Sequence, residues 1–157
     1  MASHMPDILV FMAGGARYGV EIGAVQEVVR AVSISPIPGV PSIVEGAFSL
    51  RGAIVPLLDL RSRFGHSRKA VELTDRFIVV RAGRRTVAFH ADATEGLASV
   101  EPGAIAAVQP VISRSPWITG TAALPDGLVL IHDVETFLTA AESDALASAV
   151  DLANTTP

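Results

Sequence analysis

Two aspartates are the residues whose type and position are best suited to chemistry. Asp59 follows the strand-like run AIVPLL and Asp133 follows LVLIH, and each precedes a pattern typical of a helix. Two carboxylates at matching positions can share one proton, which would give a small aspartate-dependent hydrolase. The residues after each Asp lack the small Ser/Thr-Gly turn that such proteases need. Since an Asp before a helix accepts hydrogen bonds from free backbone N–H groups, we expect both residues to be structural helix caps.

The histidines do not predict a metal site. His66, His90 and His132 are far apart in the sequence, no two of them are one helical turn apart, and none has a carboxylate at ligand spacing. His90 and His132 lie in strand patterns, which favours strand-face or hydrogen-bonded core positions. The sequence also has no phosphate-binding or dinucleotide-binding glycine motif. We therefore expect no metal, no cofactor and no catalytic residue.

A single arginine stands out in the stretch GAFSLRGAIVPLLDLRSRF, residues 46–64. Arg51 lies at the turn between two apolar strands, where a charge is cheap if exposed and expensive if buried alone. It is either a solvated turn residue or a guanidinium that a carboxylate holds rigid for a partner protein. Glu27 is the candidate carboxylate, although spacing alone does not bring the two side chains together.

Composition narrows the class of protein. The chain has 157 residues, half of them hydrophobic, and a net charge of −4, which predicts one domain that does not bind nucleic acid. It has no cysteine, so disulfides are excluded, and its N-terminal apolar run ILVFM is too short to span a membrane. We expect a cytoplasmic protein without direct membrane insertion. The first five residues, MASHM, are typical of a cloning scar.

Alternating apolar residues predict a series of hairpins. Candidate hairpins cover residues 8–22, 46–58, 77–91 and 117–133. IGAVQEVVR (22–30) has the spacing of a short amphipathic helix, and the proline-rich stretch 33–42 predicts an extended connector. The pattern from Val134 onward is helical, so residues 142–157 are expected to form a C-terminal helix and tail.

Two of these pieces occur twice. Ala13-Gly14 recurs later in the chain as Ala82-Gly83, and Gly46 recurs at nearly the same offset as Gly120. This repetition indicates an internal duplication into two small antiparallel β units, roughly 8–70 and 75–140, with strand exchange between them left open. Since closure removes exposed edges and neither unit buries much surface alone, we expect two barrels that pack through an apolar seam.

Four segments together resemble the CheW-like chemotaxis coupling proteins. The segments are AVQEVV (24–29), GAFSLRGAIVPLLDLRSRFG (46–65), the hairpin FIVVRAGRRTVAFHAD (77–92) and ALPDGLVLIHDVETFL (123–138). The string L-R-G-x-I-V-P-x-x-D-L-R is specific, and the match runs from residue 8 to about 140. The resemblance implies a single CheW-like domain over 6–141. Its fold class would be mostly β: two packed five-stranded antiparallel β-barrel subdomains, with short helices and a C-terminal helix.

The resemblance also implies a function. It predicts a non-enzymatic adaptor that couples the cytoplasmic tips of methyl-accepting chemoreceptors to the regulatory domain of a CheA-type histidine kinase. In such proteins the residues at the positions of Glu27 and Arg51 form an ion pair in the receptor-binding groove, with Val25 and Gly46 beside it. The alternatives are the hydrolase above and a small-molecule sensor that uses the seam as a pocket. Which receptor, kinase and pathway the protein serves is left open.

Overall fold

The computed structural model describes residues 7–63, 69–82, 85–99, 105–107, 118–124 and 127–132, together with 142, 145–147 and 149 near the C-terminus. The elements are β1 (Asp7–Ala13), β2 (Ala16–Glu21), the 3-10 turn η1 (Ile22–Ala24), β3 (Val25–Arg30), β4 (Val44–Leu50), β5 (Ala53–Leu58), α1 (Leu60–Arg63), β6 (Arg76–Ala82), β7 (Arg85–Ala91), β8 (Ala93–Ser99), β9 (Ile105–Ala107), β10 (Ile118–Leu124) and β11 (Gly127–His132).

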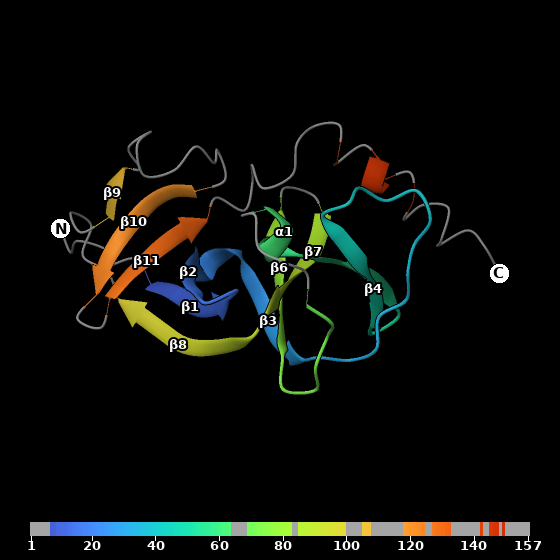
Figure 1. Ribbon diagram of the computed structural model, residues 1–157, viewed down its shortest axis with the longest axis horizontal. Coiled ribbons are helices and arrows are strands. Elements are labelled where there is room, and N and C mark those ends of the chain that lie inside the picture. The colour runs from blue at the N-terminus through green and yellow to red at the C-terminus, as the bar shows by residue number, and fades with distance from the viewer. Residues whose placement is uncertain are drawn as a thin grey trace.

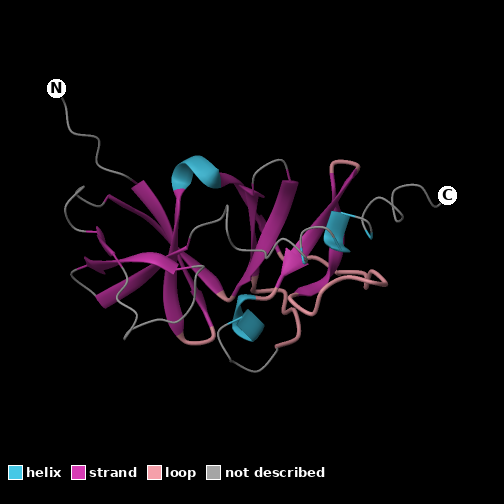
Figure 2. Cartoon of the chain, turned by 90° about the horizontal axis from the view of Figure 1, so that it is seen from above, coloured by secondary structure: helices cyan, strands magenta, loops and turns pink. Residues whose placement is uncertain are grey.

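The strands form two sheets that lie side by side (Figures 1 and 2). The first sheet has the order β8-β1-β2-β11-β10-β9 and the second has the order β3-β6-β7-β5-β4. Neighbouring strands are antiparallel, except that β2 runs parallel to β11 and β5 runs parallel to β7. The prediction of a mostly β fold with two packed β units is confirmed.

The two sheets do not coincide with the sequence halves 8–70 and 75–140, because the halves exchange their first hairpins. Hairpin β1–β2 lies in the first sheet with β8, β10 and β11, and hairpin β6–β7 lies in the second sheet with β3, β4 and β5. When the two repeats are aligned, the strands β8-β1-β2-β11-β10 correspond one by one to β3-β6-β7-β5-β4. The identical strand order supports the duplication.

The sixth strand of the first sheet has a reduced counterpart in the second. In the first sheet β9 pairs with β10, with Ala106 opposite Thr121. In the second sheet the connector after β3 makes one bridge, in which Ser35 and Ala47 exchange two backbone hydrogen bonds of 2.8 Å. The expected five strands per unit are therefore present in both sheets, and the extra pairing differs only in length.

The helix expected over residues 22–30 is wrong. Only η1 is helical there, and β3 pairs in antiparallel register with β6, with Val28 opposite Ile78 and Val29 opposite Phe77. The apolar spacing fits a helix, but β-branched valines suit a pleated sheet and β6 offers a full row of backbone partners. Tertiary pairing therefore decides the conformation of this segment.

Three apolar clusters form the described core. The largest, which we call the seam, joins both sheets: Phe11 and Tyr18 of the first sheet pack with Phe89 of the second, at ring-centroid distances of 5.8 Å for Phe11–Tyr18 and 6.4 Å for Phe11–Phe89. A second cluster fills the inner face of the second sheet, and the third packs β1 against β11. Because the seam lies between the sheets, each sheet holds the other in place.

Several expectations concern residues outside the described ones: the cloning scar at 1–5, the cap Asp133, His66 and most of the tail at 142–157. Within that tail, residues 145–147 are helical and Leu146 is buried in the seam. No helix in the described part of the chain is long and apolar enough to cross a membrane.

Gly46 lies where the connector after β3 comes closest to β4. A Cβ atom built on Gly46 would stand 2.6 Å from the backbone oxygen of Ser35, the atom that accepts the hydrogen bond from the N–H of Ala47. Real Cβ atoms do not approach a backbone oxygen so closely, so a side chain here would push the connector away. Glycine is therefore required by packing at this position.

We expect Gly46→Ala to destabilise the protein by roughly 1–3 kcal/mol, because the added methyl group overlaps backbone that cannot rotate away. Gly23→Ala is the matched control, since a Cβ at Gly23 meets nothing within 4 Å. The free energy of unfolding from urea titrations measures both. Equal stability of the two variants would contradict the close approach of the connector to β4.

Candidate functional site

Arg51 lies in a two-residue turn with an unusual backbone. Leu50 pairs with Ala53 across the turn, and the two central residues have positive φ, 48° at Arg51 and 84° at Gly52. Positive φ at both central residues is the pattern of a type I′ hairpin turn, which favours Gly, Asn and Asp. Among the described residues Arg51 is the one non-glycine with positive φ. An L-residue in this conformation costs roughly 1 kcal/mol.

The hairpin β1–β2 shows the unstrained version of the same turn. Its central residues are Gly14 and Gly15, with φ of 62° and 82°, and Ala13 pairs with Ala16 across it. Arg51 therefore occupies a position where the chain elsewhere uses glycine. Stability of the turn does not explain an arginine at this position. The role of Arg51 must therefore lie in the contacts of its side chain.

The guanidinium of Arg51 forms a two-pronged ion pair with Glu27. Nη1 donates to Oε1 of Glu27 at 3.1 Å, and Nη2 contacts Oε2 of the same carboxylate. The side chain of Arg51 is 69% exposed and that of Glu27 29% exposed, so the pair adds little to stability. The fork geometry instead limits the rotation of Arg51 and gives it a defined orientation toward solvent.

The ion pair also joins the two edges of the second sheet. Glu27 belongs to edge strand β3, and Arg51 directly follows β4, the strand at the opposite edge. The bridge between Ser35 and Ala47 joins the connector after β3 to the same β4 edge at another point. Curling of the sheet therefore brings together two residues that are distant in the sequence.

Of the other two predicted partner-binding residues, Val25 lies on the same strand as Glu27 and Gly46 lies away from the ion pair. Val25 precedes Glu27 on β3, is partly buried and packs against the seam. Gly46 is near the opposite end of β4 from Arg51, beneath the connector. The structure brings Arg51 and Glu27 together, whereas Gly46 shapes the packing of β4 at a distance from them.

A surface hollow lies next to the Arg51 turn. It has a volume of about 440 Å³ and is formed by the connector, including Ser33 and Ile37, and by the hairpin β4–β5, including Ser49 and Ile54. Ser49 and Ile54 face each other one pair before Leu50 and Ala53. The hollow therefore adjoins the turn that carries the ion pair.

Asp59 has the geometry of a cap. Its carboxylate Oδ1 accepts a hydrogen bond of 3.0 Å from the backbone N–H of Arg61, the second residue of α1. Asp59 is fully buried. A buried carboxylate that holds a helix start has no open cleft in which to act on a substrate, which gives the hydrolase hypothesis no support.

The sequence did not predict a cluster of charges that is buried at Arg61, Asp75 and His90 and partly exposed at Lys69 and Asp92. Arg61 pairs with Asp92, and Lys69 Nζ lies 3.1 Å from Asp92 Oδ1 and 2.7 Å from Asp75 Oδ1. Asp75 in turn contacts His90. The available signal was the presence of ionisable residues beside or inside apolar strand runs, as in DRFIVV and VAFHAD.

The buried charges also affect Tyr18 in the seam. Burial raises the pKa of the Tyr18 hydroxyl, and the positive charge of Arg61 offsets part of that rise.

The described residues do not form a metal site. The two ring nitrogens of His90 contact carboxylates on two different elements. In the described part of the chain no three His or carboxylate groups are placed to hold a metal ion.

Comparison with known proteins gives one consistent result. A family model described as "CheW-like domain" matches residues 7–142. The chemotaxis protein CheW of Klebsiella aerogenes is 29% identical over 138 residues, covering 87% of this chain and 83% of that protein. The chemotaxis protein CheW of Helicobacter pylori is 30% identical over 129 residues, covering 82% of this chain and 78% of that protein.

A solved structure is similar as well. The scaffolding protein TtCheW from Thermoanaerobacter tengcongensis superposes with a TM-score of 0.76 at 30% sequence identity, covering 83% of this chain and 90% of that one. The similarity therefore extends over both sheets.

We expect Arg51→Gly to be as stable as the wild type within about 1 kcal/mol, because relief of backbone strain offsets the lost exposed ion pair. Arg51→Ala keeps the strain and loses the pair, so it should be less stable than Arg51→Gly by roughly 1 kcal/mol. Urea unfolding measures both. Gly15→Ala is the matched control for backbone strain alone, since a Cβ at Gly15 meets nothing within 4 Å but the φ is 82°. Equal stability of the two Arg51 variants would contradict the positive φ at Arg51.

Proposed function

This chain belongs to the family of CheW-like domains, and on that premise we propose that it couples the cytoplasmic tips of chemoreceptors to the regulatory domain of a CheA-type histidine kinase. Family membership makes it a chemotaxis adaptor and not an enzyme. Such an adaptor acts by holding partners together, so its function depends on surfaces that bind proteins. A protein in this role works in the cytoplasm.

The observation that carries the receptor-binding proposal is the strained, exposed and oriented Arg51. A turn arginine that costs stability and is held by Glu27 presents its remaining N–H donors in a set direction. A receptor tip is a helical hairpin, and an arginine of this kind sets the register of a helix by contacting its acidic or carbonyl groups. Val25, partly buried at the seam, supplies apolar area on the same strand as Glu27.

The hollow beside the turn supports the same surface. A helix that contacts Arg51 can place one apolar side chain in the space between the connector and hairpin β4–β5, which is lined by Ile37 and Ile54. Gly46 keeps the connector close to β4 and so preserves the shape of this hollow. An oriented charge beside an apolar pocket is the usual arrangement of a protein-binding hot spot.

Arg51→Ala should weaken binding of a soluble receptor-tip fragment about tenfold or more, because loss of a hot-spot arginine typically costs about 2 kcal/mol or more and each 1.4 kcal/mol is about tenfold. Isothermal titration calorimetry measures the affinity, and circular dichroism checks that the fold is intact. Arg17→Ala is the matched control, since Arg17 forms an ion pair of 2.8 Å with Glu95 on the first sheet. Unchanged affinity of the Arg51 variant would refute the assignment of this surface.

Coupling to the kinase has a separate readout. In a mixture of receptor fragment and histidine kinase, added wild-type protein should change the rate of kinase autophosphorylation, and Arg51→Ala should change it less at the same concentration. Radiolabelled phosphate incorporation measures the rate. If the wild-type protein binds both partners and yet leaves the rate unaltered, the coupling role is wrong.

A further inference from the structure

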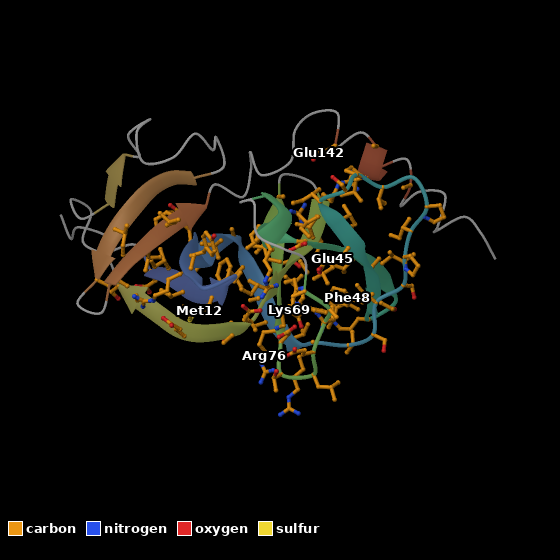
Figure 3. The ribbon with its side chains drawn as sticks, in the orientation of Figure 1. Met12, Glu45, Phe48, Lys69, Arg76 and Glu142 are labelled. Carbon is orange, nitrogen blue, oxygen red and sulfur yellow. The ribbon has the colours of Figure 1, made fainter. Side chains whose placement is uncertain are left out.

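His90 is a fully buried histidine held between two carboxylates from other parts of the second sheet. Its Nδ1 lies 2.8 Å from Oε2 of Glu45 on β4, and its Nε2 lies 2.6 Å from Oδ2 of Asp75, which precedes β6. His90 itself is on β7. The Phe77 ring stands nearly perpendicular to the imidazole, at 84° and a centroid distance of 5.9 Å, so the contact lies beside the apolar core. Glu45 and Lys69 lie near β6 and β7 in Figure 3.

With both carboxylates ionised, both ring nitrogens carry a proton in this arrangement. A neutral imidazole has one N–H donor and one lone pair, and an ionised carboxylate can only accept. If His90 were neutral, its lone pair would face a carboxylate oxygen at hydrogen-bond distance. Two ionised carboxylates at these distances therefore call for a charged imidazolium that donates to Glu45 on one side and to Asp75 on the other.

A charged His90 offsets part of the negative charge that surrounds it. The acids of the cluster are Glu45, Asp75 and Asp92; the bases are His90, Arg61 from α1 and Lys69 from the segment before β6. Lys69 Nζ also lies 3.6 Å from Oε2 of the more exposed Glu72, so the contacts include four carboxylates and, with His90 protonated, three positive charges. Loss of its proton leaves Glu45 without a cation beside it among the described residues, at a site where burial makes an unpaired charge costly.

The titration of His90 agrees with this geometry. Burial by itself lowers the pKa of His90, but the hydrogen bonds to Glu45 and Asp75 and the negative charges of both outweigh burial and raise the pKa above its ordinary value. For Asp75, an acid, burial by itself raises the pKa. Its hydrogen bonds with Lys69, the backbone N–H of Glu72 and His90 outweigh burial and lower the pKa overall.

Glu45 connects this cluster to the candidate site. Val44 pairs with Leu58 and Gly46 pairs with Leu57, so Glu45 is the extra residue of a β-bulge in β4. A bulge redirects one side chain, and here it turns Glu45 inward to His90. The residue after the bulge is Gly46, which packs beneath the connector, and β4 ends at the turn that holds Arg51.

We propose that His90 is a positioning residue whose charged form pins the Glu45 bulge, so that loss of its proton at rising pH loosens β4 and weakens partner binding at Arg51. This inference rests on the proposed function of the Arg51 surface. The partner is a protein segment, and the group that titrates lies inside the adaptor instead of at the contact. The adaptor would then bind its receptor more weakly in an alkaline cell.

The sign follows from the direction of the shift. A histidine whose pKa is raised in the folded protein stabilises that state fully below its ordinary pKa, near 6.5, and the stabilisation is lost as the pH rises through the raised value. Asp75 acts in the acid range. The stabilisation that comes from its lowered pKa is lost only when the pH falls below about 4.

The decisive variant is Glu45→Gln. Its amide oxygen can accept from Nδ1–H, or its amide N–H can donate to Nδ1 of a neutral His90 while Nε2–H still donates to Asp75, so the contact survives without a charge. Receptor-fragment binding by the wild type should be several-fold weaker at pH 9 than at pH 6.5, and Glu45→Gln should remove most of that difference. Glu95→Gln on the first sheet is the matched control and should keep the wild-type pH profile.

An NMR titration tests the site without any partner. The imidazole Hε1 signal that disappears in His90→Gln should titrate above pH 6.5 in the wild type and at lower pH in Glu45→Gln. A signal that titrates at or below pH 6.5 in the wild type would overturn the inference, and so would an identical binding profile in wild type and Glu45→Gln. If Arg51→Ala binds normally, the proposed function fails instead, whatever His90 does.

Discussion

The exchange of hairpins between the two halves of the chain is the constraint on which the structure depends. Each sheet is completed by a hairpin from the other half: β1–β2 lies between β8 and β11, and β6–β7 lies between β3 and β5. The seam that buries Phe11 and Phe89 then packs strands from both sheets against each other. Neither half has a complete sheet without the other, so the surface that carries Arg51 depends on residues from the whole chain.

Comparison of two turns separates what serves stability from what serves function. Hairpins β1–β2 and β4–β5 share the same positive-φ geometry, but the first uses Gly14 where the second uses Arg51. The ion pair with Glu27 is too exposed to compensate fully for the strain. Strained residues of this kind persist where the surrounding structure holds them and their side chains are used. Gly46, by contrast, is explained by packing alone.

Much of the fold could be predicted from the sequence because turns and alternation are local signals. The glycine-containing repeats indicated the duplication, and the resemblance around L-R-G supplied the pairing of Arg51 with Glu27. The conformation of residues 22–30 could not be predicted, since its valines fit either a helix or a strand until β6 is in place. The contacts of His90 with Glu45 and Asp75 were also hidden, because they depend on a bulge and on strand order.

The exchanged hairpins have a consequence for synthesis of the protein. Hairpin β1–β2 is translated before its sheet partners β8 and β11, which end at Ser99 and His132. The apolar residues of β1, including Leu9 and Phe11, therefore stay exposed to solvent until β8 and β11 have been synthesised and can pair with the hairpin. Such long-range pairings slow folding and leave the nascent chain open to aggregation. The duplication that gave the fold its symmetry thus also delays the burial of its first apolar strand during synthesis.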